Sequence, residues 1–310
     1  MPDIRYTVTE ESADIRIDVY LKDQLETMSR TYIQKLIKEE SLLVNNAPVK
    51  SSYVVKAGDD IFFQIPESME PNIEAEDIPL DILYEDDDLL VVNKPKNMVV
   101  HPAAGHYSGT LVNAIMYHCK GNLSGINGVL RPGIVHRIDK NTTGSLIICK
   151  NDFAHNNIAE QLFYHSITRK YRAIVHGVIN DDIGTIDAPL GRDPVDKVKM
   201  AIVEGGKRAV THYAVIERFK DYTYIECQLE TGRTHQIRVH MNSIGHPIMG
   251  DSLYGVRKNE FHTEGQTLHA KTIGFIHPRN KEYIEIDAPL PDYFEDILLK
   301  LRLSKDIMNL

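Results

Sequence analysis

The sequence contains no tryptophan and only three cysteines in its 310 residues. Cys119, Cys149 and Cys227 are far apart and odd in number, and none of them forms a C-x-x-C motif. This spacing excludes a disulfide framework and a zinc site built on paired cysteines. Reduced and mostly buried thiols are expected instead.

Long hydrophobic runs are also missing. No apolar stretch approaches the ~20 residues that a membrane-spanning helix needs. The first residues carry neither the basic nor the apolar region of a signal peptide. We therefore expect a cytoplasmic protein without a membrane segment.

Basic charge is scarce, because 35 Lys and Arg residues face 44 Asp and Glu residues and the formal net charge is -9. Nucleic-acid-binding proteins usually carry a basic surface, so this total argues against such a partner. The acid is unevenly spread, however: Glu85–Asp88 is acidic, whereas residues 169–172 and 197–208 lean positive. Since charges are screened over ~8 Å at physiological salt, a local basic groove is compatible with an acidic total.

The length allows two domains. Residues 14–68 show helical and hairpin patterns, residues 69–79 are rich in proline and acid and are typical of a linker, and residues 80–303 form the larger domain. In the first domain we expect two short helices, the second capped by Ser29. A hairpin turn is expected at Asn45-Asn46, because asparagine tolerates positive φ.

The stretch Arg131–Lys150 contains a charged group, HRIDK, between two apolar runs. The residues after it, Asn141 to Gly144, predict a turn, so Asp139 should lie on a loop between strands, where chemistry is often located. Its neighbours Arg137 and Lys140 favour the ionised carboxylate, which suits a nucleophile or an anionic stabiliser. An acidic turn residue with surface ion pairs is the alternative interpretation.

Three later segments carry structural expectations. Alternation over residues 167–178 predicts a strand with Tyr171 pointing inward, where packing is the alternative to chemistry. The charged segment Asp193–Arg208 is predicted to be a mobile excursion between strands. Thr234 is predicted to cap a helix on which Arg238 lies beside the apolar stripe and needs a carboxylate partner, unless its charged end reaches solvent.

The longer string HRIDKNTTG resembles the H-R-L-D-x-x-T-S-G signature of the RluA/RluD family of pseudouridine synthases. Ile138 stands in place of Leu and Thr143 in place of Ser. Two further blocks match in the family's order, Arg169-Lys170-Tyr171 and the string GRTHQIRVH from Gly232 to His240.

This resemblance, which extends from Leu80 to Leu290, implies an α+β fold. A catalytic domain with a mixed, mainly antiparallel sheet would follow a small N-terminal α/β RNA-binding domain of the alpha-L type. The resemblance implies an RNA pseudouridine synthase that needs no cofactor and no metal. Large-subunit ribosomal RNA is the expected substrate, transfer RNA is the alternative, and a monomer is expected.

The resemblance also implies residue roles in the catalytic domain. Asp139 is the essential carboxylate, Tyr171 packs against the target base, and Arg238 holds Asp139 through an ion pair. Arg137 fills the gap left by the extruded base. The expected phosphate contacts are Arg233 and Lys170.

In the N-terminal domain, the positions that face RNA in the family are Arg16, Arg30, Gln34, Lys35 and Lys38. Asn46 departs from the family pattern, since it replaces a turn glycine. A small helical domain with a solvated charged face is the alternative interpretation.

Three other function classes compete with the synthase. A non-catalytic ribosome-assembly factor would bind RNA without using Asp139. A nucleosidase would use the same carboxylate on free nucleosides and would need no RNA-binding domain. A metalloenzyme is disfavoured, because His136, His235 and His240 lack the spacing of metal ligands.

Overall fold

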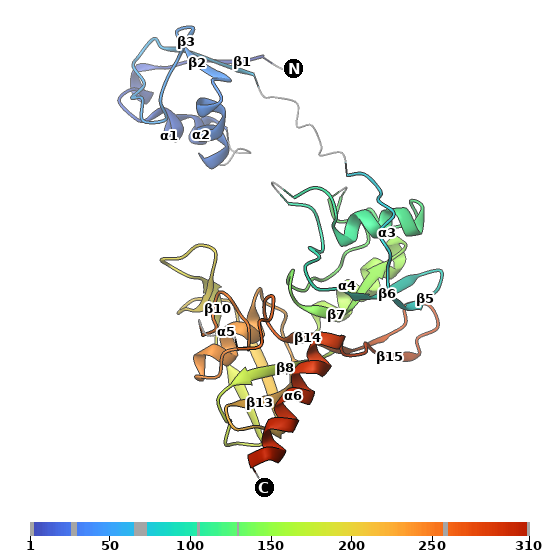
Figure 1. Ribbon diagram of the computed structural model, residues 1–310. Helices are drawn as coiled ribbons and strands as arrows, with labels where there is room; N and C mark the ends of the chain where they lie inside the picture. Colours follow the sequence, from blue (N-terminus) through green and yellow to red (C-terminus); the bar gives the residue numbers. More distant parts are fainter. Residues whose placement is uncertain are drawn as a thin grey trace. The chain divides into compact units, whose positions relative to one another are not determined.

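The computed structural model describes residues 3–25, 30–64, 73–103, 106–128, 130–256 and 260–308. The chain forms two compact units, Met1–Asn72 and Ile73–Leu310 (Figure 1). Within the described ranges, every helix is too short or too polar to cross a membrane. All three cysteines are free and buried, as predicted.

The first unit combines a four-stranded antiparallel sheet, ordered β1-β4-β2-β3, with two helices. Its elements are β1 (Asp3–Thr7), a 3-10 turn (Glu10–Ser12), α1 (Ile17–Gln24), α2 (Arg30–Lys38), β2 (Leu42–Val44), β3 (Ala47–Pro48) and β4 (Asp60–Gln64). The helices are too short to be stable alone. They are held by burial of Leu21, Ile33 and Leu36 against Phe63 of β4.

The predicted hairpin turn of this unit is confirmed. Asn45 and Asn46 join β2 to β3 with φ values of 53° and 63°. The amide of Asn45 donates to Asp59 and accepts from the backbone N–H of Asp60, which fixes the turn against β4. Ser29, the predicted cap of α2, lies outside the described residues.

The second unit is built on a nine-stranded sheet. Its elements are β5 (Ile82–Glu85), β6 (Leu89–Lys94), α3 (Leu111–Cys119), β7 (Thr143–Cys149), α4 (Asp152–Phe163), β8 (Thr168–His176), β9 (Ile183–Asp187), β10 (Leu190–Arg192), β11 (Met200–Ile202), β12 (Val210–Arg218), β13 (Tyr222–Leu229), α5 (Gln236–Ser243), β14 (Leu268–Ile276), β15 (Tyr283–Asp287) and α6 (Asp292–Met308). The order is β5-β6-β7-β14-β8-β13-β12-β9, and β15 also pairs with β14. β7 and β14 are parallel and the other neighbouring strands of this sheet are antiparallel, so the mixed, mainly antiparallel sheet is confirmed.

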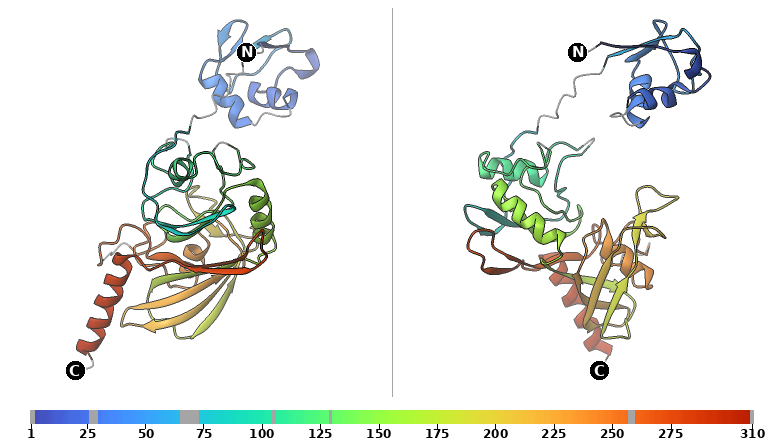
Figure 2. Two further views of the ribbon diagram at one scale, coloured as in Figure 1. Left: turned by 90° about the vertical axis from the view of Figure 1, so that its right-hand side faces the viewer. Right: turned by 180° about the vertical axis from the view of Figure 1, so that it is seen from behind.

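Helices cover both faces of this sheet (Figure 2). α3 and α5 share one face, where Tyr171 of β8 packs against the apolar clusters of both. α4 packs on the other face over β7, and α6 packs there over β8 and β13. Because successive strand residues point to opposite faces, Arg169 and Tyr171 face the α3 and α5 side, whereas Lys170 faces the α4 and α6 side.

Two local predictions are wrong. Part of the segment Asp193–Arg208 is ordered as β11, which forms an antiparallel hairpin with β10. These three-residue strands are too short to show alternation in the sequence. The hairpin is anchored through Leu190, which is buried beside Val239 of α5. Thr234 does not cap α5, because the N-cap position is occupied by His235 in a left-handed conformation, with φ of 56°.

Gly144 allows β7 and β14 to approach closely, because it has no Cβ. Its φ is +109°, and a Cβ at this position would collide with the backbone of Ala270 in β14. We expect Gly144→Ala to lower the free energy of unfolding by about 3 kcal/mol or more, because it adds both backbone strain and overpacking. Gly125→Ala is the control, since nothing lies within 4 Å of its Cβ position. Equal thermal stability of the two variants in denaturation experiments would contradict this account.

Candidate active site

Asp139 lies on a short loop that leads into β7, as predicted. The carbonyl of Asp139 accepts from the N–H of Thr142 at 3.1 Å, and Nε2 of His136 accepts from the N–H of Ile147 at 2.9 Å. Burial lowers the pKa of His136 to about 3, which keeps its ring neutral and able to accept this bond. The loop is therefore fixed to a central strand, while the Asp139 side chain stays 19% exposed.

A fully buried lysine supports the same loop. Lys94, the last residue of β6, donates from Nζ to the carbonyl oxygens of Pro95, Met98 and Lys140 at 2.8, 2.9 and 3.0 Å. Burial lowers the pKa of Lys94 to about 7, and attraction by Asp139 opposes this shift. Three carbonyls match the three N–H groups of an ammonium, so Lys94 fixes residue 140 and places positive charge behind Asp139.

Arg238 of α5 connects two carboxylates. Its Nη1 lies 2.9 Å from Oδ2 of Asp139, as the sequence analysis predicts. Its Nε and Nη2 bind Asp251 at 2.6 and 2.9 Å. Burial would lower the pKa of Arg238, but the two carboxylates outweigh it and raise the pKa. This arginine is permanently charged and is oriented by a buried partner, Asp251, that the sequence analysis did not identify.

Two aromatic rings close the charged cluster. Nε2 of His235 lies 3.9 Å from Oδ1 of Asp139, and Nδ1 of His235 lies 2.9 Å from the hydroxyl of Tyr254. The guanidinium of Arg238 lies over the Tyr254 ring, 5.1 Å from its centroid. Burial lowers the pKa of His235, so the neutral ring is favoured beside Arg238.

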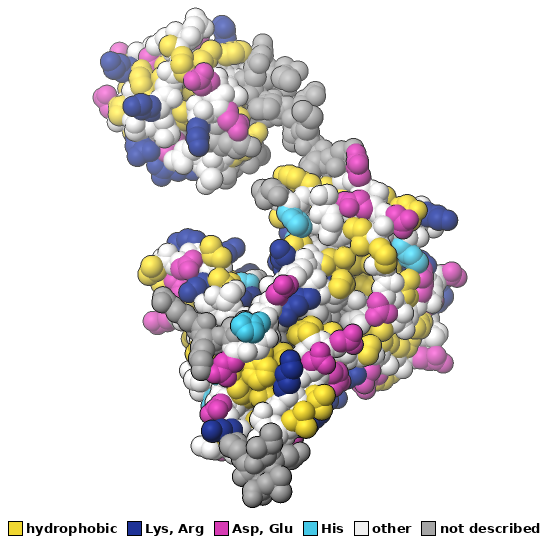
Figure 3. Space-filling model, in the orientation of Figure 1, with side chains coloured by type: hydrophobic (Ala, Val, Ile, Leu, Met, Phe, Trp, Pro, Cys, Tyr) yellow, Lys and Arg dark blue, Asp and Glu magenta, His cyan; other side chains and the backbone are white. Residues whose placement is uncertain are grey.

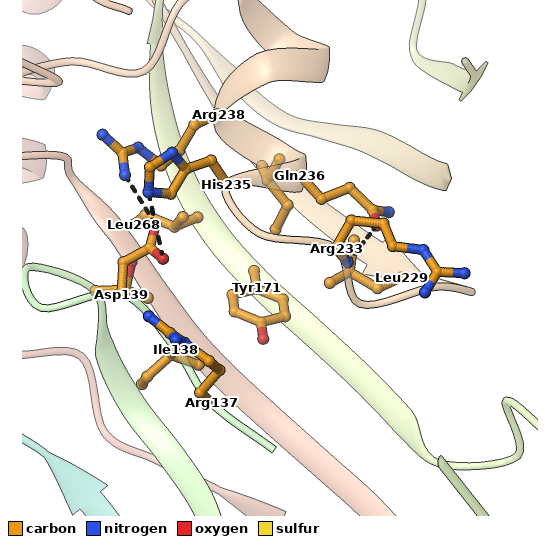
Figure 4. A pocket seen from close by; sticks show the side chains of 12 residues that line it. Arg137, Ile138, Asp139, Tyr171, Leu229, Arg233, His235, Gln236, Arg238 and Leu268 are labelled. Carbon is orange, nitrogen blue, oxygen red and sulfur yellow. Dashed lines mark hydrogen bonds and ion pairs between the residues drawn. The ribbon is translucent and has the colours of Figure 1, made fainter. Parts of the chain in front are cut away.

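A pocket opens beside Asp139. It has a volume of about 60 Å³ and is lined by Asp139, Tyr171, Arg233 and Arg238 among others. Figure 4 shows the Tyr171 ring between Asp139 and Arg233. An adjoining pocket of about 510 Å³ shares Asp139 and Tyr171 and reaches the end of α4. That size suits a ligand as large as a nucleotide.

Tyr171 presents a protonated phenol to this pocket. Burial raises its pKa, Asp139 adds to the effect, and Arg169 opposes it. The ring packs against the apolar clusters beneath α3 and α5. Tyr171 therefore offers a rigid flat wall with one hydroxyl, opposite the carboxylate.

The basic residues predicted to contact RNA in the catalytic domain divide into two groups. Arg137 and Arg233 line both pockets. Lys170 is not among the described residues that line them, because it points to the other face of β8. Arg169, two residues before Tyr171, lines the larger pocket instead. The structure thus corrects the expected position of the β8 cation by one residue.

In the first unit, three of the predicted RNA-facing residues meet around a buried carboxylate. Asp18 is fully buried and accepts from Arg16, Arg30 and Gln34 at 3.1, 3.0 and 2.6 Å. Burial acts to raise its pKa, but these hydrogen bonds lower the pKa of Asp18 to about 2. Both guanidiniums remain about half exposed, so this cluster presents excess positive charge to solvent.

The structure describes the side chain of one of the two predicted lysines of this unit. Lys38 is exposed and borders a surface pocket together with Lys50. The side chain of Lys35 lies outside the described residues.

The candidate histidines serve protein contacts. His240 bonds with Thr211 and with the carbonyl of Ala188. Within the described ranges, the side chains close enough to hold a metal together are Asp86, Asp88 and His277. These three are engaged by other groups, since Arg279 donates twice to Asp88 and His277 bonds with Asp86.

The residues missed from sequence had weak local signals. Arg169 is part of a quoted motif, whereas Asp251 and Lys94 lie outside the quoted motifs, and no spacing rule connects any of the three to Asp139. A signal was available for Arg169, because strand alternation puts it on the same face as Tyr171.

The Arg238–Asp251 pair predicts a pH-dependent loss of stability. Burial alone would raise the pKa of Asp251, but Arg238 and two backbone N–H groups lower it below 3.8. A depressed carboxyl pKa contributes stability above the unfolded-state value, and this is lost as the pH falls through the folded-state value. We expect Asp251→Asn to cost about 3 kcal/mol of unfolding free energy at pH 7 and progressively less below pH ~4.

The control for this measurement is Asp182→Asn, whose exposed carboxylate pairs with Arg218 at 2.7 Å. This surface pair should be worth less than about 1 kcal/mol. Urea denaturation from pH 3 to 8 measures both variants. A loss at Asp251 that equals the control, or that does not change with pH, would refute a structural role for the ion pair.

Known proteins share both units. Residues 88–243 match the family model of RNA pseudouridylate synthase, and residues 15–61 match the S4 domain. The chain is 52% identical over 302 residues to an uncharacterized RNA pseudouridine synthase, YlyB, of Bacillus subtilis, covering 97% of the chain and 99% of the relative. It is 46% identical over 315 residues to ribosomal large subunit pseudouridine synthase D of Zymomonas mobilis, covering 98% and 99%.

A solved structure agrees with these sequence matches. Human RNA pseudouridylate synthase domain containing 1 aligns with a TM-score of 0.57 and 25% identity, covering 76% of this chain and 98% of that one. The α+β fold and the family resemblance are confirmed. The chain therefore belongs to the RNA pseudouridine synthases, isomerases that convert uridine to pseudouridine in RNA, and it carries an S4 domain at its N-terminal end.

Proposed function

We propose that this enzyme isomerises uridines of large-subunit ribosomal RNA and that Asp139 is its essential carboxylate. The observation that carries the site assignment is the Arg238–Asp139 contact of 2.9 Å at a pocket also lined by Tyr171. The substrate assignment is supported by relatives named ribosomal large subunit pseudouridine synthase D, among them the Zymomonas mobilis enzyme.

The chemistry explains why a carboxylate is needed. The reaction breaks the bond between N1 of uracil and C1′ of ribose, turns the base and joins C5 to C1′. The proton of C5 leaves and N1 gains one, so substrate and product are isomers. A carboxylate can attack, or it can stabilise the positive character that develops at C1′ when the glycosidic bond breaks.

The neighbours of Asp139 suit this role. Arg238 binds the carboxylate directly, and Lys94 holds the carbonyl of the next residue, so the carboxylate is fixed in direction. Tyr171 would pack against the target base and handle a proton through its hydroxyl. Arg137 is exposed at the pocket and would occupy the space that the extruded base leaves in the RNA.

The S4 domain supports an RNA substrate rather than a free nucleoside. Arg16 and Arg30 are held by Asp18 with half of each side chain exposed, and Lys38 lies nearby on α2. We propose that these groups contact RNA phosphates. Transfer RNA offers the same phosphate groups to these side chains, so the choice between the two RNA substrates rests on the named relatives. Buried free thiols fit a reducing cytoplasm, and the proposal needs only a monomer.

The first test replaces the Asp139 carboxylate by an uncharged amide of nearly the same size and shape. Asp139→Asn should reduce tritium release from RNA labelled at C5 of uridine by at least about 10⁴-fold, because both routes need the anion. RNA affinity should stay close to that of the wild type. Asp182→Asn, which removes an exposed carboxylate elsewhere, is the control. An active Asp139→Asn enzyme would remove Asp139 from this role, and release of free uracil from uridine would favour the nucleosidase alternative.

The second test concerns the first unit. Deleting residues 1–72 leaves the second unit intact from Ile73, which belongs to its own apolar core. We expect the rate on a short RNA loop to be retained, while preference for structured ribosomal RNA over that loop falls by about 10²-fold, since a tethered second binding site is lost. Pseudouridine mapping on both RNAs measures this. Unchanged site choice would contradict the assigned role of the S4 domain.

A further inference from the structure

The larger pocket reaches one exposed aromatic residue, and a second exposed aromatic residue follows it in the chain. Phe163, the last residue of α4, lines this pocket and is 75% exposed. Tyr164 follows it, is 69% exposed, and meets the Phe163 ring edge to face with centroids 5.1 Å apart. Large apolar side chains left this exposed, next to a functional pocket, indicate a binding surface.

The fold explains why these rings are not buried. α4 packs on the sheet through Ala154 and Ile158, with Leu162 partly buried beside them. Phe163 follows Leu162 in the chain and lies outside the packed face of α4. His165, with φ of 59°, then turns the chain toward β8, which carries Arg169 and Tyr171 into the same pocket. The aromatic pair therefore lies at the bend between α4 and the strand that supplies Tyr171.

The charge between this pair and Asp139 is positive. The described residues that line the larger pocket include Arg137, Arg169 and Arg233, while the carboxylate among them, Asp139, is bound by Arg238. Arg169 is only 8% exposed. It donates from Nη2 to the carbonyl of Glu230, and its Nε is buried without a hydrogen-bond partner in the described part of the protein.

We propose that this end of the pocket is a subsite for the nucleotide next to the target uridine. Its base would stack on Phe163, with Tyr164 supporting the ring from its edge, and its phosphate would lie against Arg169 and Arg233. Unpaired bases in RNA are commonly held by stacking on aromatic side chains beside cationic groups. The inference rests on the proposed role of Asp139, since that role places the target uridine in the adjoining pocket.

RNA fits the subsite better than an apolar protein partner does. Phe163 shares one pocket with Asp139, so a protein bound there would obstruct the substrate. Stacking also requires no particular base, because every base has a flat face. The subsite would therefore require a base at the neighbouring position and would prefer the larger purines.

The test uses the full-length chain with Asp139→Asn, so that binding is measured without turnover. Phe163→Ala and Phe163→Leu should weaken binding of a short RNA loop by roughly 5- to 150-fold, the value of one base–aromatic stack. Phe163→Trp should restore binding. Phe153→Ala is the matched control, because Phe153 is on the same helix, is 49% exposed and does not line the pocket in the described structure.

Replacing the neighbouring base by an abasic site identifies its partner. The abasic site is placed in turn on the 5′ side and on the 3′ side of the target uridine. On one of these sides, the losses of binding affinity caused by the abasic site and by Phe163→Ala should not add, because both changes remove the same stack. With Asp139 present, Phe163→Ala should raise KM and leave kcat near its normal value, at unchanged thermal stability. Binding equal to the Phe153→Ala control, full binding by Phe163→Leu, or additive losses on both sides would each overturn the subsite.

The same measurements separate this inference from the proposed function. If Asp139→Asn still forms pseudouridine, the role of Asp139 fails whatever Phe163 does. If Asp139→Asn is inactive and the Phe163 variants bind like the control, the subsite alone fails.

Discussion

Arg238 is held between two carboxylates, and the rest of the catalytic unit depends on this arrangement. Asp251 is buried and takes two of its donors, which leaves a third for Asp139 at the pocket. A buried arginine with no partner would be strongly unfavourable. If Asp251 were the sole partner of Arg238, the charge of the arginine would be balanced and no contact would hold its side chain at the pocket. Through Arg238, α5 is connected both to the loop before β7, which carries Asp139, and to the segment after α5, which carries Asp251.

The sheet keeps this unit rigid. β7 fixes the Asp139 loop through the hydrogen bond from Ile147 to His136, and Lys94 at the end of the neighbouring β6 binds the carbonyl of Lys140. Each contact comes from a strand whose own residues are almost all buried. The carboxylate is thereby placed by backbone and buried polar groups, so little reorganisation is needed when charge develops during the reaction.

The acidic total and the RNA substrate are compatible because charge is distributed unevenly. On the face that Figure 3 shows, Asp and Glu side chains and Lys and Arg side chains are interspersed. Arg137, Arg169 and Arg233 line the same pocket, whereas the charges of distant surface acids are screened by salt. Local geometry, and not the net charge of -9, decides whether a polyanion can bind.

The sequence by itself determined the local elements, the loop position of Asp139 and, through three matching blocks, the family. These follow from short-range patterns such as strand alternation, helical period and turn residues. Tertiary structure alone decided that Asp251 orients Arg238, that Lys94 lies behind the carboxylate, and that Arg169 rather than Lys170 reaches the pocket. Arg238 and Asp139 are 99 positions apart, and contacts at such separations depend on strand order and register. No local periodicity encodes that order, because it is selected by the packing of the whole sheet.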